Sequence, residues 1–337
     1  MGLLGGLRLT PWIECVLIEC MSLSGLDKGR LKAVAALLLL CLLWSLGSLR
    51  GDLIPSTGLD QGLRSGLVRQ AIPFAMLAIG AALFAAARRE VWPRGREFVA
   101  CALIGLSLFV APTVMVYLAR IWISDLTRVA LFSIVPVFAV IFEPYIATGL
   151  EVRVKGGLAA ALVAVVGTLF VFPLDLPQSV AAAIAFCGVL LAAACVSAAN
   201  CWAVRVANRP DTCIAPFAAI AGVAAALGIV AFGAMLRDAA FGGRAMGMEI
   251  AWSAAVELPA LVLLFWLMRR MTATRMTTRF LLAPLIANLI GLIFLRPAVN
   301  VREGLGLLLI ALGAGWLLFG REGEPDADGS SLHLNAD

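Results

Sequence analysis

The sequence predicts an all-α polytopic membrane protein whose ten transmembrane helices form a five-plus-five inverted repeat. The first observation is composition: 62% of the 337 residues are hydrophobic and 14% are charged, whereas soluble domains are roughly half apolar. The second is a set of ten apolar stretches, each close to the ~20 residues that a spanning helix needs. The third is a set of prolines that recur in the second half of the chain at a nearly constant offset.

The ten apolar stretches divide evenly between the two halves of the chain. The first five are residues 33–50, 69–87, 97–119, 126–146 and 156–173. The second five are residues 179–204, 213–236, 249–268, 276–295 and 303–319. We expect helices because a bilayer offers no hydrogen-bond partner to a free backbone N–H or C=O. The stretches also lack the two-residue alternation of a lipid-facing barrel strand.

The distribution of lysine and arginine predicts that both termini are cytoplasmic. With the N-terminus inside, seventeen of the 26 basic residues fall on the cytoplasmic side, and Arg279 is counted in this set. Basic loops are retained in the cytoplasm, so this bias favours a multi-pass protein of a bacterial-type inner (plasma) membrane. The net charge of +5 then follows from orientation, and we expect no nucleic-acid partner.

The predicted repeats leave a short segment at each end of the chain. Residues 1–30 are expected to form an N-terminal cytoplasmic segment, in which Met21 is a candidate true start because ordinary polar lead-in residues follow it. The first repeat covers residues 31–174 and the second covers residues 175–320. The acidic segment 321–337 contains Gly and Ser and is expected to be a disordered cytoplasmic tail.

Four prolines give the register of the repeat. Pro112 and Pro259 are 147 residues apart, and Pro136 and Pro284 are 148 residues apart. Because each half has an odd number of helices, the second half enters the membrane in the opposite orientation. We expect these prolines to break their helices near the middle of the bilayer, where interrupted backbone lines a binding cavity.

Three local patterns resemble a known family. Residues 116–143 (VYLARIWISDLTRVALFSIVPVFAVIFE) place a tyrosine late in the third helix, then a polar turn, then a helix with a Pro-Val-Phe core. Leu43, Trp44 and Ser45 place a tryptophan and a small residue in the first helix. Glycines are spaced along the fifth helix from Gly157 onward. Together these patterns resemble the drug/metabolite transporter superfamily, in its EamA-like branch.

The resemblance covers residues 31–320, which is nearly the whole membrane part. It implies a central cavity lined by helices 1 to 4 and 6 to 9, with helices 5 and 10 at the periphery. It also implies a secondary active transporter that exports metabolites or drugs. The expected mechanism is alternating access of the two inverted halves to a small organic solute.

Glu257 is the sharpest candidate site residue, because few ionisable groups fall inside the predicted spans. It lies about eight residues into its stretch, roughly 12 Å of helix rise from the outer end, and two residues before Pro259. A functional and a structural interpretation stay open. In the first, Glu257 couples proton movement to transport or acts as counter-ion to an amine. In the second, its carboxylate is satisfied by neighbouring helices or lies nearer the outer surface.

Further candidates for the substrate cavity are polar or aromatic. Arg128 is either part of a charge-paired helix start or a gate that attracts anions. Trp44 and Tyr117 are candidates because aromatic faces bind cations and apolar solutes. Asn200 and Asn288 can hydrogen-bond across helices, either in packing or to a substrate. Glu143, by contrast, is interpreted mainly as an interface residue.

Several function classes are disfavoured by what the sequence lacks. The one histidine, His333, lies in the tail, and neither a GxxxxGK[ST] motif nor paired catalytic carboxylates occur. We therefore expect no enzyme activity, no metal and no cofactor. The expected partners are a small-molecule solute and the lipid bilayer, and the glycine-rich fifth and tenth helices offer surfaces for a homodimer. A non-transporting membrane scaffold or sensor is the alternative, ahead of a membrane-embedded enzyme.

Overall fold

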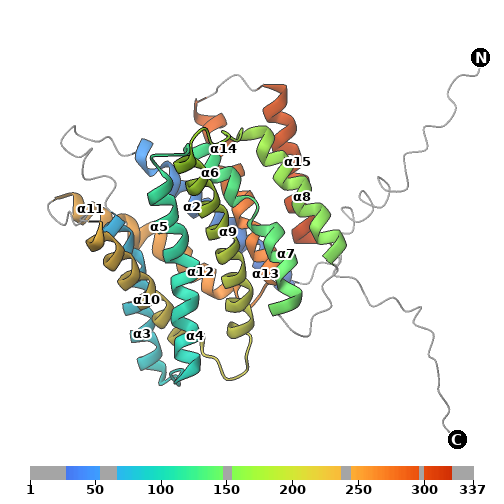
Figure 1. The fold of residues 1–337 in the computed structure, drawn as a ribbon. Helices are drawn as coiled ribbons and strands as arrows, with labels where there is room; N and C mark the ends of the chain where they lie inside the picture. The colour runs from blue at the N-terminus through green and yellow to red at the C-terminus, as the bar shows by residue number, and fades with distance from the viewer. Residues whose placement is uncertain (1–27, 54–66, 147–153, 237–243, 296–299, 321–337) are drawn as a thin grey trace, which may run out of the picture.

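A computed structural model describes residues 28–53, 67–146, 154–236, 244–295 and 300–320 (Figure 1). Across these residues the chain forms helices and no strand, so the all-α class is confirmed. The candidate start at Met21 and the predicted disordered tail lie outside the described residues.

Nine helical spans in the described part of the chain are long and apolar enough to cross a membrane. Their ends lie within four residues of the predicted stretches, and the remaining stretch forms a shorter apolar helix, Gly156–Val171. The multi-pass helical membrane fold is thereby confirmed. Apolar residues cluster in these spans because every backbone polar group must be satisfied inside the helix.

The helices follow one another along the chain in two series. The first half holds α2 (Lys28–Leu53), η2 (Leu67–Ala71), α3 (Ile72–Arg88), α4 (Arg96–Gly105), η3 (Leu106–Val110), α5 (Ala111–Ala119), α6 (Asp125–Phe132), α7 (Val135–Ile146) and α8 (Val154–Val171). The second half holds α9 (Val180–Ala207), α10 (Ile214–Met235), α11 (Arg244–Trp252), η4 (Ser253–Glu257), α12 (Leu258–Leu267), α13 (Ala273–Thr277), α14 (Arg279–Leu295) and α15 (Val301–Phe319).

The third and eighth spans each contain one stretch of π-helix, η3 and η4. The backbone N–H after η3 donates to the carbonyl of Leu106, five residues earlier, and the N–H after η4 donates to that of Ser253. Pro112 and Pro259 each follow one residue later, in the first turn of α5 and of α12. At both prolines, therefore, the regular α-helix is interrupted by a π-helical stretch, and the chain does not leave the helix. Both spans continue, because the wider turn gives space to a ring that would clash with the carbonyl of residue i−4 in a regular α-helix.

The fourth and ninth spans are interrupted. The fourth is interrupted between α6 and α7, directly before Pro136. The ninth breaks at Thr278, between α13 and α14, while α14 continues through Pro284. The predicted break at Pro284 is therefore wrong in position. Next to Pro284, the Ser45 hydroxyl of α2 donates to the carbonyl of Ala283 at 2.8 Å, which links α14 to α2.

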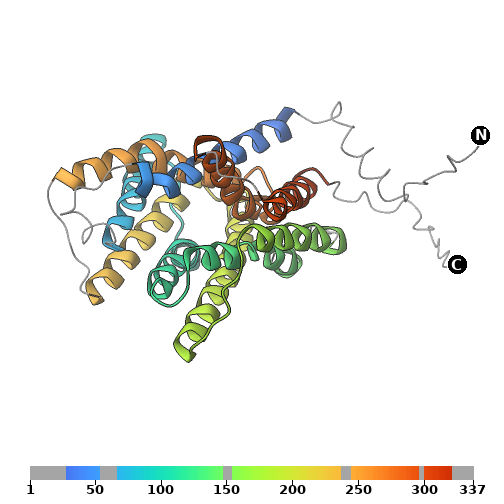
Figure 2. The same ribbon diagram turned by 90° about the horizontal axis from the view of Figure 1, so that it is seen from above.

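Two helix pairs lie at opposite edges of the molecule (Figures 1 and 2). At one edge α8 packs against α15, and at the other α3 packs against α10. A Cβ added to Gly313 of α15 would lie 2.6 Å from the carbonyl oxygen of Ala160, so this close approach requires glycine. Between the two pairs, α2 packs against α12 and α14, and α9 packs against α5 and α7.

Candidate functional site

An open cavity of about 410 Å³ lies beside the turn of residues 120–124, where α5 meets α6. We call this side of the molecule the cavity end. Three predicted site residues, Pro112, Tyr117 and Arg128, line the cavity. The full lining is Gln70, Pro112, Thr113, Val116, Tyr117, Arg120, Arg128, Phe132 and Phe280.

Two arginines give this cavity a positive charge. Arg128 forms an ion pair with Asp125 and donates to the carbonyl oxygen of Val116 at 2.9 Å. The Arg120 guanidinium carbon lies 3.8 Å from the centroid of the Tyr117 ring, which is a cation–π contact. The Asp125 side chain is 84% exposed, so water screens its charge. Arg128 is therefore charge-paired at a helix start, and it also lines the cavity.

Two stacked phenylalanines lie between the cavity and the centre of the protein. Phe132 ends α6, and Phe280 lies in the first turn of α14. Their ring centroids are 6.2 Å apart with an interplanar angle of 18°. Both rings also line the cavity.

Beyond Phe280 lies a buried arginine, Arg279, which is 1% exposed. Its guanidinium carbon lies 4.7 Å from the Phe280 ring centroid and 5.2 Å from that of Trp44. It donates to the side-chain oxygen of Asn200 at 2.8 Å and to the carbonyl of Met276 at 3.1 Å. Arg279 thus brings together two predicted site residues, Trp44 and Asn200, that come from different halves of the chain.

Arg279 corrects the sequence analysis, which counted it among the basic residues at the cytoplasmic surface. The helix break at Thr278 places the arginine at the start of α14, inside the span Ala273–Phe294. The rule that intramembrane ionisable residues are functional candidates would have selected it, because it falls inside the predicted stretch 276–295. Because Arg279 lies near the end of that stretch, it was counted with the basic residues of the loop.

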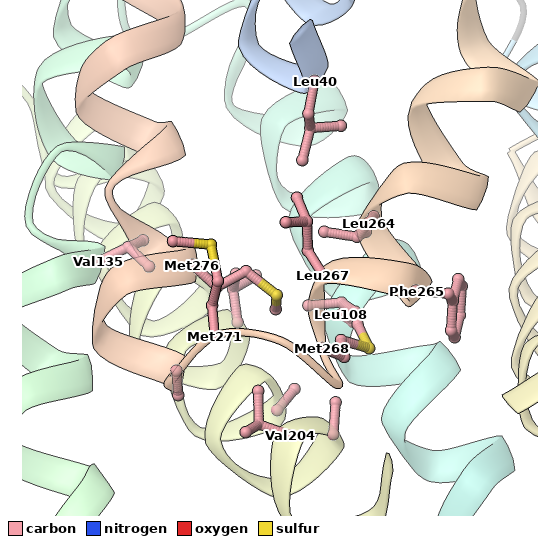
Figure 3. Close-up of a cluster of buried hydrophobic side chains, with 14 of the residues drawn as sticks. Leu40, Leu108, Val135, Val204, Leu264, Phe265, Leu267, Met268, Met271 and Met276 are labelled. Carbon is pink, nitrogen blue, oxygen red and sulfur yellow. The ribbon is translucent and has the colours of Figure 1, made fainter. Parts of the chain in front are cut away.

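The opposite end of the site is packed closed around the turn of residues 268–272, where α12 meets α13; we call it the closed end. Figure 3 shows the apolar side chains gathered here. Leu264, Leu267, Met268 and Met276 are each 0% exposed. These four side chains are therefore closely packed and excluded from solvent.

Polar contacts join the loops over the closed end. Asn208 donates to the carbonyl of Met268 at 3.0 Å. Arg269 donates in return to the carbonyls of Ala207 at 3.0 Å and of Thr212 at 2.9 Å. The turn between α12 and α13 is therefore tied to the turn between α9 and α10.

Glu143, near the end of α7, caps the start of α13 at this closed end. Its carboxylate accepts hydrogen bonds from the backbone N–H of Ala273 at 2.9 Å and of Thr274 at 3.1 Å, and from the Thr274 hydroxyl. The side chain is 1% exposed. A carboxylate at a helix N-terminus satisfies orphan N–H groups and favours the helix dipole. Glu143 is thus an interface residue that caps the N-terminus of α13.

Two predicted residues lie apart from the cavity. Glu257 is half-buried at the end of η4, where it accepts a hydrogen bond from the Ser253 hydroxyl at 2.7 Å. Asn288 is half-buried in α14. Neither is among the residues that line the 410 Å³ cavity.

Comparison with known proteins adds the fold alone. No family model matches the chain, and no curated protein matches it. One solved structure, described only as "Crystal structure of protein", is similar with a TM-score of 0.66 and 16% sequence identity. The match covers 85% of this chain and 98% of that one, so the likeness extends over the whole helical arrangement.

Proposed function

We propose that this protein is a secondary active transporter that moves a small organic solute across the inner membrane by alternating access. The observation that carries the proposal is the pair of unlike ends: a cavity open between α5 and α6, and a packed seal between α12 and α13. A transporter that works by alternating access has this arrangement when one side is open, because access to the central site must then be closed on the other side. The family resemblance implies export.

The proposal includes an inverted five-plus-five repeat, which features at equal offsets in the two halves support. The two π-helical stretches, Leu106–Val110 and Ser253–Glu257, are 147 residues apart, as are Pro112 and Pro259. The helix-capping residues Ser124 and Thr272 are 148 residues apart. Equal offsets in sequence and in local backbone geometry are what a duplication with later divergence leaves behind.

The helix contacts agree with this pairing. If α2 is equivalent to α9, then the contacts of α2 with α12 and α14 correspond to those of α9 with α5 and α7, and both sets are present. The pairs α3 with α10 and α8 with α15 would each join equivalent helices. Ten spans with both termini cytoplasmic would place the closed end, which carries Arg205, Arg209 and Arg269, on the cytoplasmic side.

Transport is the function to test first. Purified protein in proteoliposomes is screened for uptake of organic anions, cations and neutral solutes, with an imposed pH gradient of either sign. We expect at least one solute to accumulate, and we expect Glu257→Gln to weaken the dependence on the pH gradient. Glu249→Gln is the matched control. Glu249 lies on the same span as Glu257, but its carboxylate is 3.6 Å from Arg69 in an ion pair.

Two results would contradict these proposals. If folded, reconstituted protein moves no solute of the panel but binds a protein partner, the scaffold interpretation replaces transport. If Glu257→Gln and Glu249→Gln keep the full pH-gradient dependence, transport stands and Glu257 is a structural residue.

A further inference from the structure

We propose that Arg279 binds an anionic group of the transported solute, so that the solute class is a small organic anion. This inference rests on the proposed transport function and names the chemistry of its central site. The observations that carry it are the burial of Arg279, its lack of an acidic partner among the described residues, the Nε nitrogen that has no hydrogen-bond partner there, and its position behind the cavity.

The charge of Arg279 has no acidic partner in the described part of the chain. The side chain is 1% exposed, and the ion pairs found there join Arg69 to Glu249, Arg128 to Asp125 and Arg209 to Glu97. A buried guanidinium without a counter-charge is unfavourable. The rings of Trp44 and Phe280 offset this only in part, because a cation–π contact is weaker than an ion pair in a dry site.

The guanidinium also keeps a donor free. Its two terminal nitrogens donate to Asn200 and Met276, while the buried Nε–H has no hydrogen-bond partner. Buried donors are rarely left in this state without a reason. The bonds to Asn200 and Met276 fix the orientation of the guanidinium, and its Nε edge stays available to a ligand. A carboxylate accepts from Nε and a terminal nitrogen together, in the two-bond geometry that arginine favours.

A route from the cavity to Arg279 passes Phe280. The Phe280 ring lines the cavity and also contacts the guanidinium, so a rotation of this one side chain would connect the two. Its stacking on Phe132 closes the route in the present arrangement. Arg120 and Arg128 stand in the cavity on the near side of this pair, where positive charge raises the local concentration of anions. The aromatic walls favour an anion that also has an apolar part.

The test uses matched acid and amide pairs: acetate and acetamide, benzoate and benzamide, phenylacetate and phenylacetamide, nicotinate and nicotinamide. Binding to purified protein is measured by thermal stabilisation, and uptake is measured in proteoliposomes. We expect at least one carboxylate to bind and to be transported while its amide is not. Arg279→Gln should lower that apparent affinity about tenfold or more, because a charged hydrogen-bonded contact is lost. Arg279→Lys should retain part of it.

Controls separate a local effect from misfolding and from a free anion. Arg275→Gln, on the neighbouring helix α13, should keep the carboxylate preference, since that arginine donates to the carbonyl of Gly320. The same binding measurement with sodium chloride at equal concentration distinguishes binding of an inorganic anion from binding of a carboxylate solute. Elution of each variant as a single peak in size-exclusion chromatography shows that it is folded.

The outcomes are distinct. Equal binding of acid and amide, a response to chloride alone, or an unchanged affinity in folded Arg279→Gln protein overturns the anion site. If neutral or cationic solutes are transported and no carboxylate is, the transport function stands and the anion inference fails. If nothing is transported but carboxylates bind in an Arg279-dependent manner, the site stands and the transport function fails.

Discussion

The starts of α6 and α13 are equivalent in the proposed repeat, yet one borders an open cavity and the other is packed closed. Ser124 and Thr272 cap the two helices in the same manner, each accepting from the backbone N–H three residues on. The side chains around them differ. Tyr117 and Arg128 in the cavity correspond, at offsets of 147 and 148, to the fully buried Leu264 and Met276.

The two ends therefore differ in polarity. Arginine and tyrosine keep the cavity end hydrated, because a charged side chain is costly to bury. Leucine and methionine at the equivalent positions let the closed end exclude water. Methionine is also flexible, so a seal built from Met268 and Met276 can repack when that end opens.

The largest expected effect comes from removing the carboxylate at the closed end. Glu143→Ala leaves two buried backbone N–H groups unpaired, and at ~1–3 kcal/mol for each such donor the loss of stability is about 3 kcal/mol. Asp175→Ala is the matched variant at the cavity end, where an exposed carboxylate accepts from the Ser124 hydroxyl at 2.7 Å; we expect a loss below about 1 kcal/mol. Thermal unfolding in detergent compares the two, and equal losses would refute the contrast.

An intermediate effect is expected in side-chain accessibility. In a background without reactive native cysteines, Tyr117→Cys should react with a membrane-impermeant maleimide about tenfold faster or more than Leu264→Cys, because packed side chains react only after local opening. A solute that is transported should narrow this difference. Similar rates in its absence would mean that the two ends open equally often.

The smallest effect is expected for the ion pair at the cavity end. Asp125→Asn removes the partner of Arg128, but Asp125 is 84% exposed, so the pair contributes below about 1 kcal/mol to stability. Folding should therefore be nearly unchanged. Uptake of an anionic solute should rise at low ionic strength, because the cavity becomes more positive, and this rise should disappear at high salt. A large loss of stability would show that the pair is structural.

The fold was largely predictable from the sequence, and the site was predictable only in part. Spans are set by composition, which is a local property, so their ends came out within a few residues. Tyr117 was a candidate because of its aromatic face, and Arg128 because it belongs to a cluster of charges at a polar turn. Arg279 and the capping role of Glu143 depend on the helix break at Thr278 and on a contact between residues 130 positions apart. Neither is visible in hydropathy or charge counts.

The two π-helical stretches have a consequence for the face that each following helix presents. One extra residue in a turn rotates everything after it by about 100° relative to an uninterrupted α-helix. Thr113, Val116 and Tyr117, which come after η3, line the cavity only in this rotated register. Deleting one residue from η3 would leave the third span long enough for the membrane while turning these three side chains away from the cavity. The phase of the helix therefore decides which side chains line the cavity.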